Sequence, residues 1–209
     1  MIIKAHHHFI VYPFFKIYTL ISIRRNFHEV KIIGEATEKN LPMLVVANHF
    51  SWWDGIFVNY VNMKKFKRRF YFMMLEEQLQ IYSFFRKLGG YSVRKHSRTM
   101  IESLRYTQEL LSKKSNMVLI FPQGAIQSLY HSTLIFEQGI ERIVNNLSNE
   151  IQLVFIVNLI DYFSHPKPTL YIYLKEYRLN GENLSEMQDS YNAFLQECIE
   201  ANKKIVDTP

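Results

Sequence analysis

The most constraining stretch of the sequence is a short apolar run, Leu44 to Ala47, that stops abruptly at Asn48 and His49. A run of β-branched and other apolar residues bounded by polar ones predicts a buried strand. Ser51 followed three residues later by Asp54 is a capping-box pattern, which predicts a helix from Trp52. A strand that passes directly into a helix is typical of α/β proteins. Their connecting turns lie at the carboxyl edge of the sheet, where ligands usually bind.

His49 and Asp54 have the chemistry of a catalytic pair. A neutral imidazole can take a proton from a hydroxyl group at neutral pH. A carboxylate in the first helical turn can bind one ring nitrogen, select the tautomer and stabilise the imidazolium that forms. The alternative is structural, with Asp54 only capping the helix and His49 lying in a turn. The residues alone leave both interpretations open.

Length and charge limit the class of protein. A chain of 209 residues suits one α/β domain with a sizeable core. The single cysteine, Cys198, excludes an internal disulfide framework and fits a reducing compartment. Residues 1–105 carry a net charge of +10 and residues 106–209 a net charge of −4. A basic, aromatic-rich first half favours an anionic membrane surface or phosphate-bearing substrates. We expect no nucleic-acid partner, because no nucleic-acid-binding module is recognisable.

Residues 9–23 form the most apolar segment and predict a helix with a narrow polar stripe at Lys16, Thr19 and Ser22. The apolar run is shorter than the ~20 residues that span a bilayer. The following Arg24-Arg25 suits lipid headgroups. We therefore predict a membrane-associated segment over residues 1–27 and an α/β domain over residues 28–209. The alternative is a helix packed on the core of the domain.

The rest of the chain alternates between predicted strands and helices. Lys64 to Arg69 is a basic run, interpreted either as a solvated helix end or as a contact for a headgroup or an acyl carrier. The pattern predicts an α/β fold with a mixed, largely parallel sheet flanked by helices. Strands are predicted at 28–34, 44–47, 70–75, 91–95, 117–121, 151–157 and 169–177, and helices at 52–63, 76–88, from Ser97 and from about Ser185.

The stretch Asn48-His49-Phe50-Ser51-Trp52-Trp53-Asp54 resembles the H-x-x-x-x-D motif of the glycerolipid acyltransferase family, which includes the 1-acylglycerol-3-phosphate acyltransferases. The resemblance implies that His49 is the general base and that Asp54 orients it. Further segments resemble the other motifs of the family in the same order, over residues 28–160.

The second and third motifs are present with substitutions. A glycine and a short strand end at Arg94 and Lys95, where the resemblance implies contact with the acceptor's phosphate. Lysine supplies the charge but lacks the bidentate guanidinium. Phe121-Pro122-Gln123-Gly124 resembles the F-P-E-G of the third motif, with Gln123 in place of the glutamate and Ile126 in place of the arginine of F-P-E-G-T-R. Phe136-Glu137-Gln138-Gly139 resembles the F-K-x-G segment that follows.

The resemblance implies transfer of a fatty acyl group from acyl-CoA or acyl-carrier protein to the hydroxyl of a lysolipid or another lipid. Two alternatives remain, a non-catalytic lipid-binding homologue and a His-dependent acyl-thioester hydrolase. We expect no metal and no cofactor, although His6-His7-His8 is a short histidine tract. We expect a peripheral or monotopic protein on the cytoplasmic face of the cell membrane. Because Gln123 and Ile126 are uncharged, we expect a less charged acceptor than lysophosphatidic acid.

Overall fold

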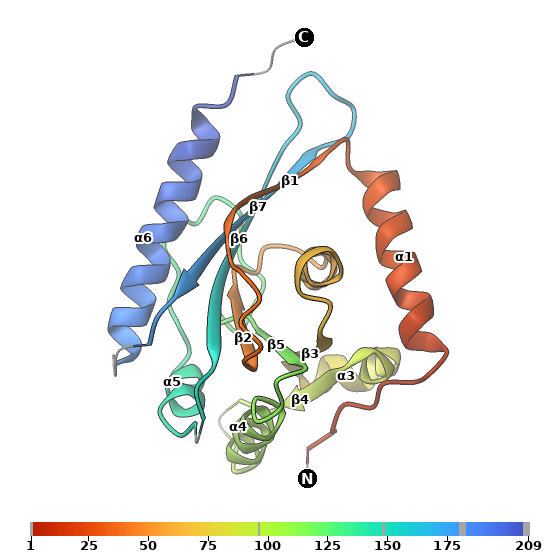
Figure 1. Cartoon of the computed structure of the whole chain (residues 1–209), viewed down its shortest axis with the longest axis vertical. Helices are drawn as coiled ribbons and strands as arrows, with labels where there is room; N and C mark the ends of the chain where they lie inside the picture. Colours follow the sequence, from red (N-terminus) through yellow and green to blue (C-terminus); the bar gives the residue numbers. More distant parts are fainter. Residues whose placement is uncertain (1, 96, 148, 180–182, 207–209) are drawn as a thin grey trace.

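A seven-stranded mixed sheet forms the centre of the computed structural model, which describes residues 2–95, 97–147, 149–179 and 183–206 (Figure 1). The order of its strands is β1-β7-β6-β2-β5-β3-β4. All neighbouring strands are parallel except β6 and β7, so β1 and β7 run opposite to the other five. The prediction of a mixed, largely parallel sheet is confirmed. The strands are β1 (Val30–Glu35), β2 (Met43–Ala47), β3 (Arg69–Leu75), β4 (Gly90–Val93), β5 (Asn116–Ile120), β6 (Gln152–Asp161) and β7 (Thr169–Tyr177).

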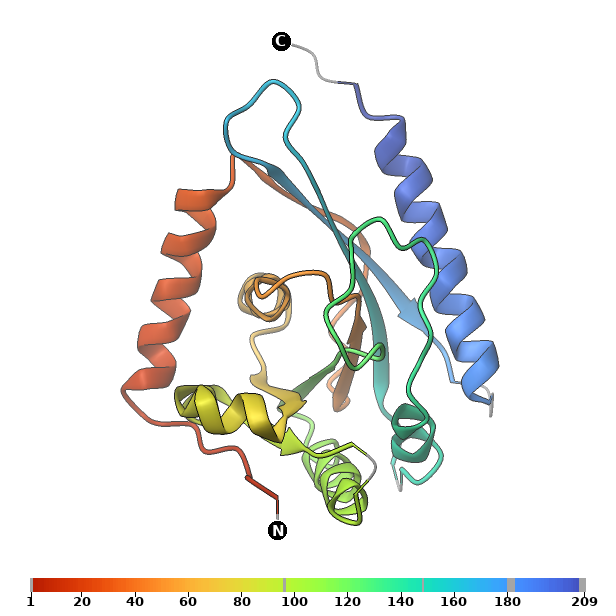
Figure 2. The same ribbon diagram turned by 180° about the vertical axis from the view of Figure 1, so that it is seen from behind.

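Helices cover both faces of the sheet (Figures 1 and 2). Alternate residues of the buried strand β2 point to opposite faces, as the period of a strand requires. Val45 packs in the cluster that includes α1 and α2, whereas Val46 packs in the cluster that includes α4, α5 and α6. The helices are α1 (Val11–Asn26), α2 (Asp54–Val61), α3 (Glu76–Ile81), α4 (Thr99–Leu110), α5 (Gly139–Val144) and α6 (Leu184–Lys203).

Two predicted helices differ from those observed. The helix expected from Trp52 begins at Asp54, because the Ser51 hydroxyl accepts a hydrogen bond from the Trp53 N–H and holds a turn there. The helix expected over 76–88 leaves helical geometry at Tyr82 (φ −107°, ψ 58°) and continues as a 3₁₀ helix, Ser83–Leu88. In this second part Phe85 packs edge-on against Phe72 of β3, with 5.8 Å between ring centroids.

The basic run from Lys64 to Arg69 is not one solvated helix end. Lys64 and Lys65 are exposed in a π-helical turn, Asn62–Phe66. Arg68 is buried, where its guanidinium forms an ion pair with Glu38 and donates to the carbonyl of Lys114 at 3.0 Å. Arg68 is therefore a structural residue, and only its neighbours remain available to a ligand.

The N-terminal residues lie along the open edge of the sheet. Ile3 donates to the Ser92 hydroxyl at 2.8 Å and accepts from the Ser92 N–H at 2.9 Å, so it contacts the edge strand β4. His6 and His8 donate backbone hydrogen bonds to the carbonyls of Arg86 and Lys87. Ile3 thus covers the N–H of Ser92, which an edge strand otherwise leaves open, and His6 and His8 hold the segment to the 3₁₀ helix Ser83–Leu88.

Helix α1 buries its polar side and exposes its apolar side. Thr19 and Ser22, from the predicted polar stripe, are buried, and Thr19 accepts from Asn59 of α2. Most of the large apolar side chains of this segment are exposed to solvent instead. They are Phe9, Ile10, Phe14, Ile17, Tyr18, Leu20 and Ile21. Among the described residues, no helix is both long and apolar enough to cross a bilayer.

His7, within the N-terminal segment, is partly buried and is held in the neutral form. Its Nε2 lies 2.8 Å from the carbonyl of Phe70 and its Nδ1 accepts from Arg69 Nε at 3.1 Å. The pKa of His7 is lowered from 6.5 to about 4, mainly by burial and in smaller part by the cation of Arg69, against the opposing hydrogen bond to Phe70. No group of three His, Cys, Asp or Glu side chains that could hold a metal ion occurs in the described part of the chain, the His6–His8 tract included.

We expect the free energy of unfolding to fall as the pH falls from about 6.5 to about 4, because the unfolded chain takes up a proton on His7 before the folded chain does. The stabilisation is therefore complete above pH 6.5 and decreases below it. Denaturant unfolding at pH 7.5 and at pH 5 checks this expectation. The variant His7→Gln should lose less stability between these pH values than the wild type, and an equal loss would contradict the assignment.

Candidate active site

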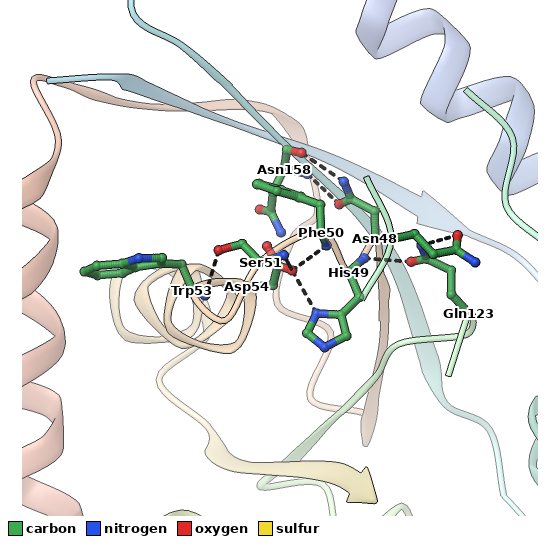
Figure 3. A network of polar contacts seen from close by, with 9 residues as sticks. Asn48, His49, Phe50, Ser51, Trp53, Asp54, Gln123 and Asn158 are labelled. Carbon is green, nitrogen blue, oxygen red and sulfur yellow. Dashed lines mark hydrogen bonds and ion pairs between the residues drawn. The ribbon is translucent and has the colours of Figure 1, made fainter. Parts of the chain in front are cut away.

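The loop from Asn48 to Trp53 leaves the carboxyl end of β2 and is fixed to the neighbouring strand β6 (Figure 3). The Asn48 side chain donates to the carbonyl of Asn158 at 2.9 Å and accepts from its N–H at 2.8 Å. This paired contact replaces the ladder that ends with β2. Asn48 therefore sets the position at which His49 leaves the sheet. Asn48 has no predicted role in the sequence, although its place directly after the buried strand is a signal.

His49 and Asp54 contact one another as the sequence predicts (Figure 3). Nδ1 of His49 lies 2.8 Å from Oδ2 of Asp54. An ionised carboxylate only accepts hydrogen bonds, so Nδ1 carries the proton and Nε2 of the neutral ring is free to accept one. Nε2 has no hydrogen-bond partner among the residues that the structure describes, and one fifth of the His49 side chain is exposed. The ring can therefore receive a proton from a bound hydroxyl group.

Asp54 is fully buried and serves the loop as well as the ring. Its Oδ2 also accepts from the N–H groups of Phe50 and Ser51, each at 2.8 Å. Burial raises the pKa of the Asp54 carboxyl, while the hydrogen bonds from His49, Ser51 and Phe50 act against that rise. These three donors favour the charged form, which is the form that holds Nδ1–H of His49. The same carboxylate thus fixes the shape of the loop and the tautomer of the imidazole.

The third motif supports His49 from the other side. Phe121, just after β5, stacks on the imidazole with 4.0 Å between ring centroids and an interplanar angle of 10°. Gln123 is buried, and its Oε1 accepts from the His49 N–H at 2.7 Å (Figure 3). Its Nε2 donates to Gln127 at 2.9 Å. The carbonyl of Pro122 accepts from the Glu137 N–H at 2.8 Å. Gln123 therefore connects the loop of His49 to the loop that follows β5.

An ion pair lies directly over Gly124. Lys95 Nζ is 2.6 Å from Glu137 Oε1, and a Cβ added at Gly124 would lie 2.5 Å from that Nζ. Gly124 also has a φ of +64°, which side-chain-bearing residues rarely adopt. Arg94 points elsewhere and pairs with Glu76 at 2.7 Å. Both cations expected to bind an acceptor phosphate thus have carboxylate partners. The sequence signal for this pairing is Glu137, which stands where the resembled motif has lysine.

The backbone donors near the start of α2 are already committed. The N–H of His49 donates to Gln123, those of Phe50 and Ser51 donate to Asp54, and that of Trp53 donates to Ser51. None of these four N–H groups is therefore open to stabilise an oxyanion. Cys198 is buried in α6, and burial raises the pKa of its thiol to about 12, which suits a core residue rather than a nucleophile.

This fold and site define a class of protein: an α/β domain with a carboxylate-held histidine at the carboxyl edge of a mostly parallel sheet. A family model described as Acyltransferase matches residues 29–158 of the chain. The chain belongs to the acyltransferase family. The match spans the loop of His49 and Asp54 and the loop of Gln123, so it includes every contact of the imidazole described above.

A solved structure of similar fold is the crystal structure of the 1-acyl-sn-glycerophosphate (LPA) acyltransferase PlsC from Thermotoga maritima. It is 15% identical to this chain, with a TM-score of 0.59. The alignment covers 94% of this chain and 81% of that chain. The match extends well beyond residues 29–158 and thus shows that most of the chain shares this architecture. No curated protein sequence matches the chain.

Proposed function

We propose that the protein transfers a fatty acyl group from an acyl thioester to a lipid hydroxyl group, with His49 as the general base. The observation that carries the proposal is the hydrogen bond of 2.8 Å between His49 Nδ1 and the buried Asp54, which leaves Nε2 free. Family membership supports the acyl-transfer chemistry.

The geometry supports a simple sequence of proton transfers. Nε2 of His49 removes the proton from the acceptor hydroxyl as its oxygen attacks the thioester carbonyl. Asp54 stabilises the imidazolium that forms. The tetrahedral intermediate then expels the thiolate, which takes the proton back from Nε2, so the products are an ester and a free thiol. Phe121 and Gln123 keep the ring and its backbone in place during both transfers.

One assay distinguishes this function from the two alternatives. Purified protein is incubated with labelled acyl-CoA or acyl-carrier protein and total lipid extract, and the products are followed by mass spectrometry. Labelled ester in the lipid fraction supports the proposal. Free fatty acid without labelled lipid would indicate a hydrolase, and unchanged thioester would indicate a lipid-binding homologue. The donor that is consumed identifies the acyl carrier.

The acceptor that fits the site best has little negative charge. Lys95 and Arg94 are paired with Glu137 and Glu76, so a phosphate monoester would compete with these carboxylates for both cations. Gln123 is occupied by His49 and Gln127. These pairings add to the uncharged Gln123 and Ile126 found in the sequence. We therefore favour a zwitterionic or uncharged lipid hydroxyl over lysophosphatidic acid.

The exposed face of α1 supports contact with a membrane, the medium from which such an acceptor would come. Phe27, just after α1, packs edge-on against Trp53 of the catalytic loop, with 5.7 Å between ring centroids. A bilayer on the outer face of α1 would therefore lie beside the helix that contacts this loop. The basic Arg24 and Arg25 in the last turn suit anionic headgroups. We also propose that the membrane surface in contact with α1 is the cytoplasmic face of the cell membrane.

We expect the triple variant Phe14→Gln, Ile17→Gln, Ile21→Gln to bind vesicles at least about tenfold more weakly than the wild type, since burying one large apolar side chain is worth about 1.5–3 kcal/mol. These side chains are 65%, 56% and 59% exposed, so their replacement should leave the fold intact. Vesicle sedimentation measures the effect. The matched control is Ile101→Gln, Ile135→Gln, Val206→Gln, which are exposed elsewhere. Equal losses in the two triples would contradict a membrane face on α1.

A further inference from the structure

A cavity of about 340 Å³ lies between the start of α1 and the start of β3. Tyr12 and Lys16 of α1, Lys67 and Arg69 border it. Arg69 begins β3, so the cavity lies at the amino edge of the parallel strands, whereas His49 follows the carboxyl end of β2. Its volume is in the range of small-ligand sites. It is therefore distinct from the site of acyl transfer.

The charged groups around this cavity are all positive. None of the residues that line it is acidic. Arg68 is neutralised by Glu38, but Lys16, Lys67 and Arg69 form no ion pair with any described residue of the chain. Like charges gathered in one concavity repel each other, and a bound anion relieves the repulsion.

Two further side chains, Tyr12 and His8, add hydrogen-bond donors. The Tyr12 hydroxyl accepts from the Phe70 N–H at 3.1 Å, so its own proton remains to be donated. Nδ1 of His8 accepts from the N–H of Ile10 at 3.3 Å and therefore carries no proton when the ring is neutral. The proton is then on Nε2, which can donate. The cavity thus presents donors from several elements.

Local structure fixes the backbone of Lys67 and the side chain of Arg69. Lys67 adopts a left-handed backbone conformation with φ +55°, which closes the π-helical turn and ends the helix. The side chain of Arg69 is fixed by its hydrogen bond to the neutral His7. Lys16 lies with its Nζ 4.9 Å from the ring centroid of Tyr12. The Arg69 side chain, held by its hydrogen bond to His7, loses less conformational entropy on binding than a free side chain does.

We propose that this cavity binds a phosphate group, and that the phosphate belongs to the headgroup of an anionic lipid. A phosphate offers three or four acceptor oxygens, which match a site built only of donors. The lipid source follows from Phe9, which lines the cavity and is 81% exposed, and from Lys16, which belongs to the helix with the exposed apolar face. The assignment of the phosphate to a lipid headgroup rests on the membrane contact proposed above, whereas the proposal of a phosphate site does not. Neither depends on His49 chemistry.

The test compares two double variants that remove the same charge. Lys16→Gln/Lys67→Gln removes two cations of the cavity, and Lys64→Gln/Lys65→Gln removes two exposed cations of the adjacent turn that do not line it. The full-length proteins are titrated with inorganic phosphate by calorimetry. They are also sedimented with phosphatidylcholine vesicles that contain either phosphatidic acid or an equal charge of fatty-acid carboxylate. Circular dichroism and the unfolding midpoint confirm that each variant is folded. If the Lys16→Gln/Lys67→Gln variant (the cavity pair) does not fold, Lys67→Gln alone replaces it. Lys64→Gln/Lys65→Gln is the control pair.

We expect the cavity pair to weaken binding to phosphatidic acid vesicles at least about tenfold more than binding to carboxylate vesicles. The control pair should weaken both equally, because it acts only through surface charge. Suppose that Lys16→Gln/Lys67→Gln loses binding of inorganic phosphate but weakens binding to both kinds of vesicle equally. This result would support the phosphate site and would overturn the anionic lipid as the source of the phosphate. Equal behaviour of the two pairs in every arm would overturn the proposal.

Discussion

Replacing His49 with alanine is expected to lower the rate of acyl transfer at least about 100-fold, which is the usual scale for the loss of a general base. The protein should still fold, because the ring is partly exposed and its backbone N–H remains bound to Gln123. The rate of ester formation from labelled thioester measures the effect. The matched control is His6→Ala, which replaces an exposed histidine outside the site. Near-normal turnover in His49→Ala protein would exclude the mechanism.

Asp54→Asn should also lower the rate, because a neutral amide stabilises the imidazolium less and no longer favours the same tautomer. This variant should also unfold at a lower denaturant concentration, since the carboxylate accepts from the N–H groups of Phe50 and Ser51. The loss of activity should exceed what the unfolded fraction explains. The His49→Ala variant, which keeps these two hydrogen bonds, separates the catalytic effect from the structural one.

The second large effect concerns the acceptor. We expect the rate with lysophosphatidic acid to be roughly ten- to a hundredfold below the rate with a zwitterionic or uncharged lysolipid, because one charge-assisted partner of a phosphate is worth about 1.5–3 kcal/mol. In Glu137→Gln protein Lys95 loses the carboxylate that lies 2.6 Å away, so this preference should narrow. Side-by-side rates on the two acceptors, with wild type and variant, measure both expectations.

The matched control is Glu141→Gln, which removes the same charge one helical turn further along the chain, where no described cation pairs with it. It should leave the acceptor preference unchanged. A wild-type preference for lysophosphatidic acid would contradict the acceptor proposal without affecting the role of His49. A shift in Glu141→Gln as large as that in Glu137→Gln would show that net charge, rather than the Lys95 pair, sets the preference.

Local signals predicted the strands and the pairing of His49 with Asp54. A buried apolar run specifies β2 by itself, and a spacing of five residues across a helix start brings the two side chains together. The boundaries differ where a side chain competes with the backbone, as Ser51 does at the start of α2. Contacts within one turn are thus readable from sequence.

Contacts between distant elements were not predicted. Lys95 and Glu137 are 42 residues apart, and only the fold brings them together over Gly124. Arg68 appeared to belong to a solvated run, but Glu38, 30 residues earlier, neutralises it in the interior. The periodicity of α1 correctly separated polar from apolar residues, yet it did not show which side faces the protein. Which side of α1 faces the protein depends on the residues that it packs against. Here Asn59 of α2 donates a hydrogen bond to Thr19, so the polar side faces inward.

The contact between residues 2–8 and the edge of β4 affects how shortened forms of this protein would behave. Cutting before the α/β domain removes α1 together with the segment that satisfies the backbone of Ser92. The uncovered strand would then be open to pairing with another chain, and edge-to-edge association follows from such exposure. A shortened protein could sediment because it self-associates, with no lipid present. Point changes on the outer face of α1 avoid this confusion, because they leave the edge of the sheet closed.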